Sequence, residues 1–296
     1  MTPATANNTP LPMRIDFRSR LLMFIFISLV CVLIASLLMA IVLGSEGAAS
    51  TPRLRIATVI QDIFCFIVPA IGLSAVSTAL PARFLGIDKG FDMTQLLLAV
   101  AVMLFSIPLM NVIVDWNANL TLPESLAGFE AWAKAAEERA AGSVKVMLGA
   151  DTAGSTIASI LIVGVLAGLS EELYFRGALQ RLLATGPLGA HTAVWVTATL
   201  FSLMHMQFYG LVPRILLGAL FGYLFLWTGS IWLPVIIHAL NNSIYILSYR
   251  NPTAGIDRFG TGDIWLALAS AIICFFLLRT LYRRSTSGKP TKKSPV

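Results

Sequence analysis

Long apolar segments, separated by short polar ones, dominate this chain of 296 residues. The chain is 57% hydrophobic and only 12% charged, and its mean hydropathy is +0.80. A soluble domain carries about twice that share of charged residues. A helix needs roughly 20 apolar residues to cross the hydrocarbon core of a bilayer. The pattern excludes an ordinary soluble domain and predicts an all-α fold, a polytopic transmembrane helical bundle.

The apolar segments predict about eight spans within a single transmembrane domain at residues 21–284. The predicted spans are Leu21–Leu43, Ile56–Leu80, Thr94–Val114, Thr152–Gly177, His191–Gln207, Leu211–Trp227, Ile231–Leu247 and Ile264–Leu281. Residues 1–20 and the basic segment 285–296 lack such apolar runs. We expect both to be disordered tails.

The basic residues predict how the bundle is oriented. With the predicted spans, thirteen of the 21 Lys and Arg residues fall on the side of the N-terminus and eight on the other side. Loops on the cytoplasmic side of a membrane carry the excess of positive charge. We therefore expect both termini in the cytoplasm and the chain in a bacterial plasma membrane. The net charge of +6 reflects this bias. The chain has no basic stripe with interleaved aromatic residues, which is the pattern that would predict nucleic-acid binding.

The hydrophilic insert at residues 115–151, between the third and fourth predicted spans, predicts an amphipathic helix. Its apolar face would contain Leu126, Phe129, Trp132 and Ala133, and its water-facing side would contain Glu130, Lys134, Glu137 and Glu138. Two interpretations remain open. The helix could lie on the outer membrane surface, or it could act as a lid or a docking element for substrate.

Two adjacent carboxylates, Glu171 and Glu172, end a long apolar stretch. A charged group at membrane depth is costly unless it is paired or hydrated, and such residues are usually functional. Glu172 precedes Arg176 by four residues, which favours an ion pair along one helix face. This leaves Glu171 free to act as a general base on water. Alternatively, both glutamates would simply end a span at the lipid headgroups.

Two histidines lie in later apolar segments. His205 follows Phe201 by four residues, and His238 precedes Asn242 by four, so each pair lies on one helix face. The hairpin between the fourth and fifth spans would bring Glu171 and His205 to depths that differ by only about 6 Å. All three groups meet if the glutamate helix continues into the cytoplasm. Alternatively, each histidine is a structural residue, and His238 and Asn242 form helix–helix hydrogen bonds.

Three short motifs in this region resemble those of one protein family. Glu171–Arg176 (EELYFR) resembles the EExxxR motif of the CPBP family, which comprises CAAX prenyl proteases and bacteriocin-processing proteases. Phe201–His205 (FSLMH) resembles the family's FxxxH motif, and His238–Asn242 (HALNN) resembles its HxxxN motif. The three occur in the family's order, each on its own predicted span. We expect the catalytic core to be residues 152–247.

The resemblance implies a role for each of these residues. Glu171 and His205 would activate water, while His238 and Asn242 would form an oxyanion hole for the tetrahedral intermediate. The predicted ion pair between Glu172 and Arg176 would hold these residues in place. The family has been described both as metalloproteases and as proteases that use a glutamate-activated water. Zn²⁺ takes three protein ligands, which Glu171, His205 and His238 could supply. The chain lacks an HExxH motif, and both routes stay open.

These expectations together predict an intramembrane endopeptidase of the CAAX-protease type. Its partners would be the lipid bilayer and a peptide or membrane-protein substrate, lipidated or otherwise associated with the membrane. One alternative is a non-catalytic scaffold, or a bacteriocin-immunity type of membrane protein, that uses the same cavity for binding. A second alternative is a transporter with a proton relay, but the chain shows no inverted repeat.

Overall fold

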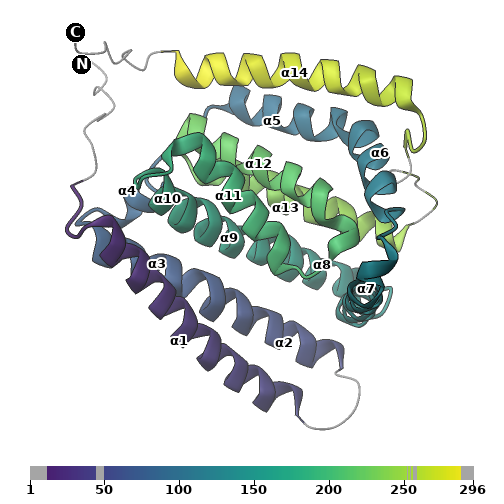
Figure 1. The fold of residues 1–296 in the computed structure, drawn as a ribbon, viewed down its shortest axis with the longest axis horizontal. Coiled ribbons are helices and arrows are strands. Elements are labelled where there is room, and N and C mark those ends of the chain that lie inside the picture. Colours follow the sequence, from purple (N-terminus) through teal and green to yellow (C-terminus); the bar gives the residue numbers. More distant parts are fainter. Residues whose placement is uncertain (1–11, 45–49, 252, 254, 256–258, 288–296) are drawn as a thin grey trace.

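The computed structural model describes residues 12–44, 50–251, 253, 255 and 259–287, which form a bundle of helices (Figure 1). Long helices run back and forth between two ends of the molecule. In the described part of the chain, the strand-like pairing is limited to one isolated bridge between Met13 and Thr78. The prediction of an all-α bundle is confirmed.

The N-terminal half forms one hairpin, a bent helix pair and a helix at one end of the bundle. Its elements are α1 (Phe17–Leu43), α2 (Thr51–Gln61), η1 (Asp62–Ile67), α3 (Val68–Ser77), α4 (Pro81–Leu85), α5 (Met93–Phe105), α6 (Ile107–Ala118), η2 (Glu124–Leu126) and α7 (Ala127–Leu148). The segments α2, η1 and α3 form one continuous rod beside α1. Pro108 lies in the first turn of α6, where a proline is tolerated but cannot continue α5, and the two helices bend by 46°.

The C-terminal half forms the centre of the bundle and its last helix. A continuous rod comprises α8 (Ala153–Ser159), η3 (Ile160–Leu166), α9 (Ala167–Glu172), η4 (Leu173–Gln180) and α10 (Arg181–Ala184). It is followed by α11 (Gly189–Met204), η5 (Phe208–Gly210), α12 (Leu211–Thr228), α13 (Trp232–Arg250) and α14 (Ile264–Thr286). The rod continues beyond the predicted end of its span at residue 177, as the meeting of the three motifs requires.

Many helices are long and apolar enough to cross a membrane. Five segments meet this test in the described part of the chain: Phe17–Leu43, Thr51–Ser77, Ala153–Ala184, Phe208–Thr228 and Ile264–Thr286. The bent pair α5–α6 raises the number to six. The predicted total of eight remains a prediction, because α11, with 16 residues, and the more polar α13 are not among these segments.

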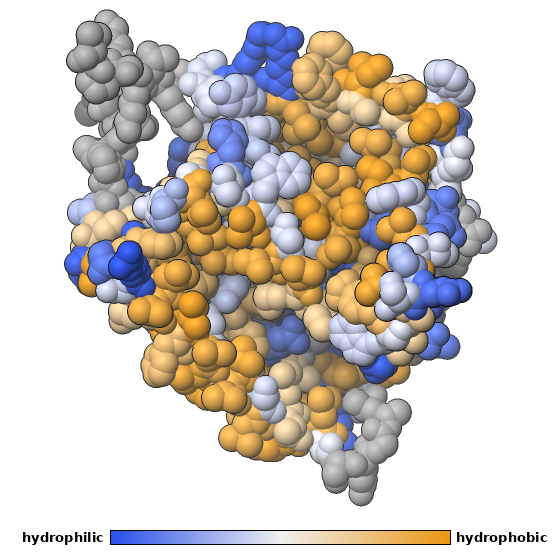
Figure 2. Space-filling view, in the orientation of Figure 1, coloured by the Kyte–Doolittle hydropathy of each residue, from blue (hydrophilic) through white to orange (hydrophobic). Residues whose placement is uncertain are grey.

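Large apolar side chains cover the outside of the bundle. On α1, Leu22, Phe26, Leu33 and Ile41 are 66% to 71% exposed. The space-filling view shows this hydrophobic surface over α1 to α3, with a small hydrophilic recess beside it (Figure 2). Exposed apolar area on this scale is unfavourable in water and favourable against lipid. An outer surface of this kind matches helices that face the lipid of a membrane.

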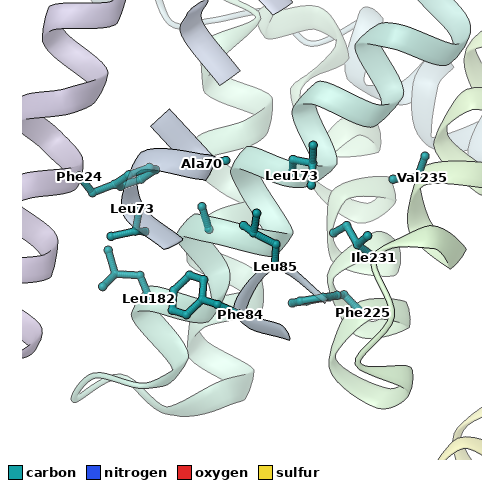
Figure 3. Packing of buried hydrophobic residues seen from close by; sticks show 11 residues of the cluster. Phe24, Ala70, Leu73, Phe84, Leu85, Leu173, Leu182, Phe225, Ile231 and Val235 are labelled. Carbon is teal, nitrogen blue, oxygen red and sulfur yellow. The ribbon is translucent and has the colours of Figure 1, made fainter. Parts of the chain in front are cut away.

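A buried apolar cluster fixes where α13 begins. Phe84 and Leu85 of α4 insert among side chains from α1, α3, η4, α12 and α13 (Figure 3). Gly86 then turns with φ 76°, and a Cβ there would lie 2.8 Å from the carbonyl oxygen of Gly229. Only glycine permits this approach, which allows the Gly86 carbonyl to accept from the Ile231 amide at 3.1 Å. The start of α13 is thereby held inside the protein.

The predicted amphipathic helix of the insert is α7. It is seen nearly end-on in Figure 1, so it lies across the ends of the bundle helices. Phe129 and Trp132 pack on Phe208 with ring centroids 5.1 and 5.4 Å apart. The prediction differs from the structure in one detail. Glu137 is only partly exposed to water, because its Oε2 is buried without a hydrogen-bond partner, and Glu138 is exposed as expected.

Part of the predicted N-terminal tail is folded. The prediction of disorder for residues 1–20 is wrong for residues 12–20, because α1 begins at Phe17 and the Arg14 amide donates to the Ser77 carbonyl at 2.8 Å. Asp16 caps α1 by accepting from the Ser19 amide. Within the predicted tail 285–296, α14 extends to Thr286. Residues 1–11 and 288–296 lie outside the described residues.

Candidate active site

Small residues bring two of the three motifs together. The rod that contains Glu171 packs on α13, and a Cβ at Gly168 would lie 3.1 Å from the Ala239 amide nitrogen. A Cβ at Gly164 would lie 2.8 Å from Ser243 Oγ. Glycines at these positions permit close approach of the two backbones. As a result, the side chain of His238 on α13 reaches both glutamates at the end of α9.

Glu172 is the centre of a buried polar network. Its Oε1 accepts from Arg176 Nη1 at 2.7 Å and lies 2.8 Å from His238 Nδ1. The side chains of Glu172 and Arg176 are 0% exposed, so protein encloses this pair completely. The guanidinium also donates to the Gly218 carbonyl at 2.9 Å and lies over the ring of Phe201 at 4.7 Å. The ion pair predicted from the four-residue spacing is confirmed.

Glu171 has a different environment from its neighbour. Its side chain is 16% exposed, and its Oε2 lies 3.7 Å from His238 Nε2. The imidazole of His238 therefore lies between the two carboxylates, and it stacks on Phe221 with ring centroids 4.8 Å apart. Glu171 is also within electrostatic range of His205 and Arg214. This partly open carboxylate can contact water, whereas Glu172 cannot.

His205 ends α11 and is exposed. Its Nδ1 lies 2.8 Å from the Phe201 carbonyl oxygen, so that nitrogen carries the proton and Nε2 has a free lone pair. The next residue, Met206, has φ 54°, a left-handed conformation that is strained for a side chain other than glycine. Such strain often accompanies functional sites. Here it turns the chain sharply after the imidazole.

Phe201 connects the two histidines. Its ring packs edge to face on both imidazoles, with ring centroids 5.0 Å apart for His205 and 5.8 Å apart for His238. Within the described residues, no hydrogen bond or ion pair joins His205 directly to Glu171 or Glu172. The structure therefore brings Glu171, Glu172 and His238 into contact and places His205 across one phenyl ring from them.

Asn242 has a partner that the sequence did not predict. Its Nδ2 donates to the carbonyl of Val163 at 3.1 Å. Val163 lies in the π-helical segment η3, and π-helical turns often occur at functional sites. One amide hydrogen of Asn242 is used in this bond. The second remains available to an oxyanion.

Two functional candidates were missed by the sequence analysis. Asp62 is 1% exposed, accepts from Ser170 Oγ at 3.0 Å and lies within electrostatic range of Glu171. Its position as an acid in an apolar span was a usable signal. Arg214 donates to Gln207 and lies within electrostatic range of Glu171 and Glu137. As a lone arginine in an apolar span, it gave the same signal.

The side-chain arrangement does not fit a metal centre. In the part of the chain that the structure describes, no three side chains among His, Cys, Asp and Glu are placed to hold a metal ion. The expected ligands Glu171, His205 and His238 do not converge on one point. A zinc site needs three converging protein ligands. We therefore derive no reaction step through a metal.

Comparisons with known proteins match the same region. Residues 153–244 match a family model described as type II CAAX prenyl endopeptidase Rce1-like, close to the predicted core of 152–247. The uncharacterized protein YpbD of Bacillus subtilis (strain 168) is 22% identical over 99 residues. That alignment covers 32% of this chain and 48% of YpbD, so the chain spans about half the length of this relative. No solved structure matches the chain.

Proposed function

We propose that this chain, a member of the CPBP family, hydrolyses peptide bonds within the membrane. Its residues 153–244 match the family model of type II CAAX prenyl endopeptidases. The observation that carries the proposal is the contrast between the two glutamates. Glu172 is fully buried and bonded, and it holds His238 beside the partly open Glu171. A fixed carboxylate–imidazole pair next to a second carboxylate is suited to water activation.

In the proposed mechanism, Glu171 and His205 share a water molecule. The carboxylate of Glu171 orients the water, and His205 Nε2 accepts a proton, because its Nδ1 is bonded to the Phe201 carbonyl. Hydroxide attack on the peptide carbonyl forms a tetrahedral intermediate. The proton then passes to the departing amine. This is general base catalysis followed by general acid catalysis.

We assign stabilisation of the oxyanion to His238 and Asn242. Asn242 has one amide hydrogen beyond its bond to Val163. His238 would donate from Nε2, because its Nδ1 is bonded to Glu172 and its Nε2 faces the side of Glu171. A donor of this kind typically contributes about 3–4 kcal/mol to catalysis.

The proposed substrate is the membrane-adjacent segment of a lipidated or membrane-spanning polypeptide. A cavity of about 410 Å³ lies between the bent α5–α6 pair, α12 and α13, and Arg214 and Asn241 are among its lining residues. Its other walls include Met103, Met110 and Leu217. An apolar cavity with a few polar groups is a typical binding site. The electrostatic link from Arg214 to Glu171 supports this cavity as the route to the site.

The test is cleavage of a library of membrane peptides by the purified chain in liposomes. We expect Glu171→Gln and His205→Gln each to lower the rate about a hundredfold or more. His191→Gln is the matched control, because His191 lies on the same helix but bonds to Tyr223 at the far end. Wild-type rates in both site variants would refute the proposal.

The same preparation separates the alternatives. Peptide binding without cleavage, unchanged by Glu171→Gln, would favour the scaffold or immunity-type function. Zinc is tested by metal analysis of the purified chain and by chelation. Since the ligands do not converge, we expect full activity after chelation. Loss of activity that zinc restores would show that substrate or metal rearranges the site.

A further inference from the structure

A second cavity lies at the end of the bundle where α1 begins. Its volume is about 510 Å³. It is lined by Arg20 in the first turn of α1 and by Arg181 and Thr185 at the end of the long rod. The predicted orientation would place this end in the cytoplasm and the cavity at the level of the inner headgroups.

Two arginines line this cavity without an ion-pair partner. Arg20 is 4% exposed and donates to Thr185 Oγ1 at 3.1 Å. Arg181 donates to the Arg83 carbonyl at 3.0 Å. In the described chain neither guanidinium forms an ion pair. Asp16 and Asp88 lie within electrostatic range but not in contact. A buried charge without a counter-ion is costly, so the cavity favours an anion.

The surroundings of the two arginines are amphipathic. The guanidinium of Arg181 lies over the ring of Phe225 at 4.8 Å, and Met13 and Leu226 complete an apolar wall. Gly229 lines the cavity, and the Nζ of Lys89 lies 3.1 Å from where a Cβ on Gly229 would be. A free phosphate would use the cations and leave the apolar wall without a partner. A phospholipid would use both.

We propose that this cavity binds the phosphate headgroup of an anionic glycerophospholipid from the inner leaflet. The phosphate lies between the guanidinium groups of Arg20 and Arg181, and Thr185 contributes a hydroxyl. The glycerol backbone and upper chain pack against Met13 and Phe225. Basic pockets between helices on the cytoplasmic side bind lipid headgroups in this way. The bound lipid would tie α1 to the rod that carries Glu171 and Glu172.

Native mass spectrometry of the purified full chain with phosphatidylglycerol tests this proposal. We expect Arg20→Gln and Arg181→Gln each to weaken lipid retention about tenfold or more. Arg18→Gln is the matched control, because Arg18 lies on the same helix at the same depth but is exposed. It should retain the lipid within about twofold of wild type. Thermal unfolding of each variant without lipid reports whether the fold survives.

The controls distinguish the sources of the phosphate. Equal retention of zwitterionic phosphatidylcholine would overturn the proposal, as would equal weakening by Arg18→Gln. Unchanged retention in both Arg20→Gln and Arg181→Gln would do the same. If inorganic phosphate displaces phosphatidylglycerol at equal concentration, the cavity is a free-anion site and the lipid assignment is wrong. If Arg20→Gln fails to fold, Arg181→Gln alone decides the outcome.

Discussion

At the scale of single residues, two adjacent glutamates have opposite tasks. Glu172 is fully buried, and both Arg176 and His238 bond to its Oε1. Glu171 keeps a partly exposed carboxylate that faces the other side of the same imidazole. Adjacent helical residues point in directions about 100° apart, so the two carboxylates have different surroundings. One carboxylate builds the site, and the other is available for chemistry.

The buried pair allows a prediction about stability. Arg176→Met leaves the charge of Glu172 buried without its cation, which should cost about 3–5 kcal/mol of unfolding free energy. The matched control is Lys134→Met, which removes the cation of the exposed pair with Glu130 and should cost about 1 kcal/mol or less. Denaturant titration of the purified chain measures both. Similar losses in the two variants would show that burial does not increase the contribution of the Glu172 pair to the unfolding free energy.

Spacing in the sequence was informative where partners lie on one helix. The four-residue interval predicted the bond between Glu172 and Arg176, and it predicted that Phe201 lies against His205. Contacts between distant segments gave no such signal. Asp62 meets Ser170 across 108 positions, so nothing in the local pattern connected that acid to the site. The strain at Met206 likewise depends on how α11 ends in three dimensions.

At the scale of elements, the contact between α9 and α13 positions His238. Gly164 and Gly168 face α13 with almost no space for a side chain. The wider π-helical segments η3 and η4 flank α9 on both sides. The sequence predicted both helices and the order of the motifs. It did not reveal that glycines set the distance between them.

This contact gives a second prediction. Gly168→Val would push the backbone of α13 away from α9, because a Cβ alone already lies 3.1 Å from the Ala239 amide nitrogen. We expect loss of cleavage and a lower melting temperature. Gly154→Val on the same rod is the control, because nothing lies within 4 Å of an added Cβ there. Equal activity of the two variants would contradict the proposed role of this contact.

A third prediction concerns α7 and pH. Burial raises the pKa of the Glu137 carboxyl, and the nearby Arg214 only partly opposes this. The protonated form is therefore favoured in the folded state, and docking of α7 weakens as pH rises above the ordinary value of about 4.3. Glu137→Gln should slow hydrogen exchange in α7 at neutral pH but not at low pH. The exposed Glu138→Gln is the control, and an equal effect there would exclude burial as the cause.

At the scale of the whole molecule, the fold separates chemistry from anchoring. The active-site motifs lie on rods inside the bundle, while α1 and α14 present apolar surfaces to lipid. Composition and hydropathy were sufficient to predict this architecture. The cavity between α1 and the long rod could not be predicted, because its two arginines are 161 positions apart, and only the assembled bundle brings them together.

The predicted orientation is tested by labelling with a membrane-impermeant thiol reagent. A chain with Glu138→Cys on α7 should be labelled in intact cells, because α7 lies at the end of the bundle opposite the start of α1. A chain with Arg18→Cys should be labelled only after the membrane is opened. The reverse pattern would invert the topology and move the proposed lipid site to the outer leaflet.

The central claim is that Glu171 directs water onto a peptide bond, and isotopic labelling tests it most directly. Membrane peptides are cleaved in water enriched in heavy oxygen, and the products are weighed by mass spectrometry. The account predicts that wild-type protein releases a product whose new carboxylate carries the heavy isotope, and that Glu171→Gln releases almost none. Labelled product formed at the wild-type rate by Glu171→Gln, with peptide binding unchanged, would contradict it.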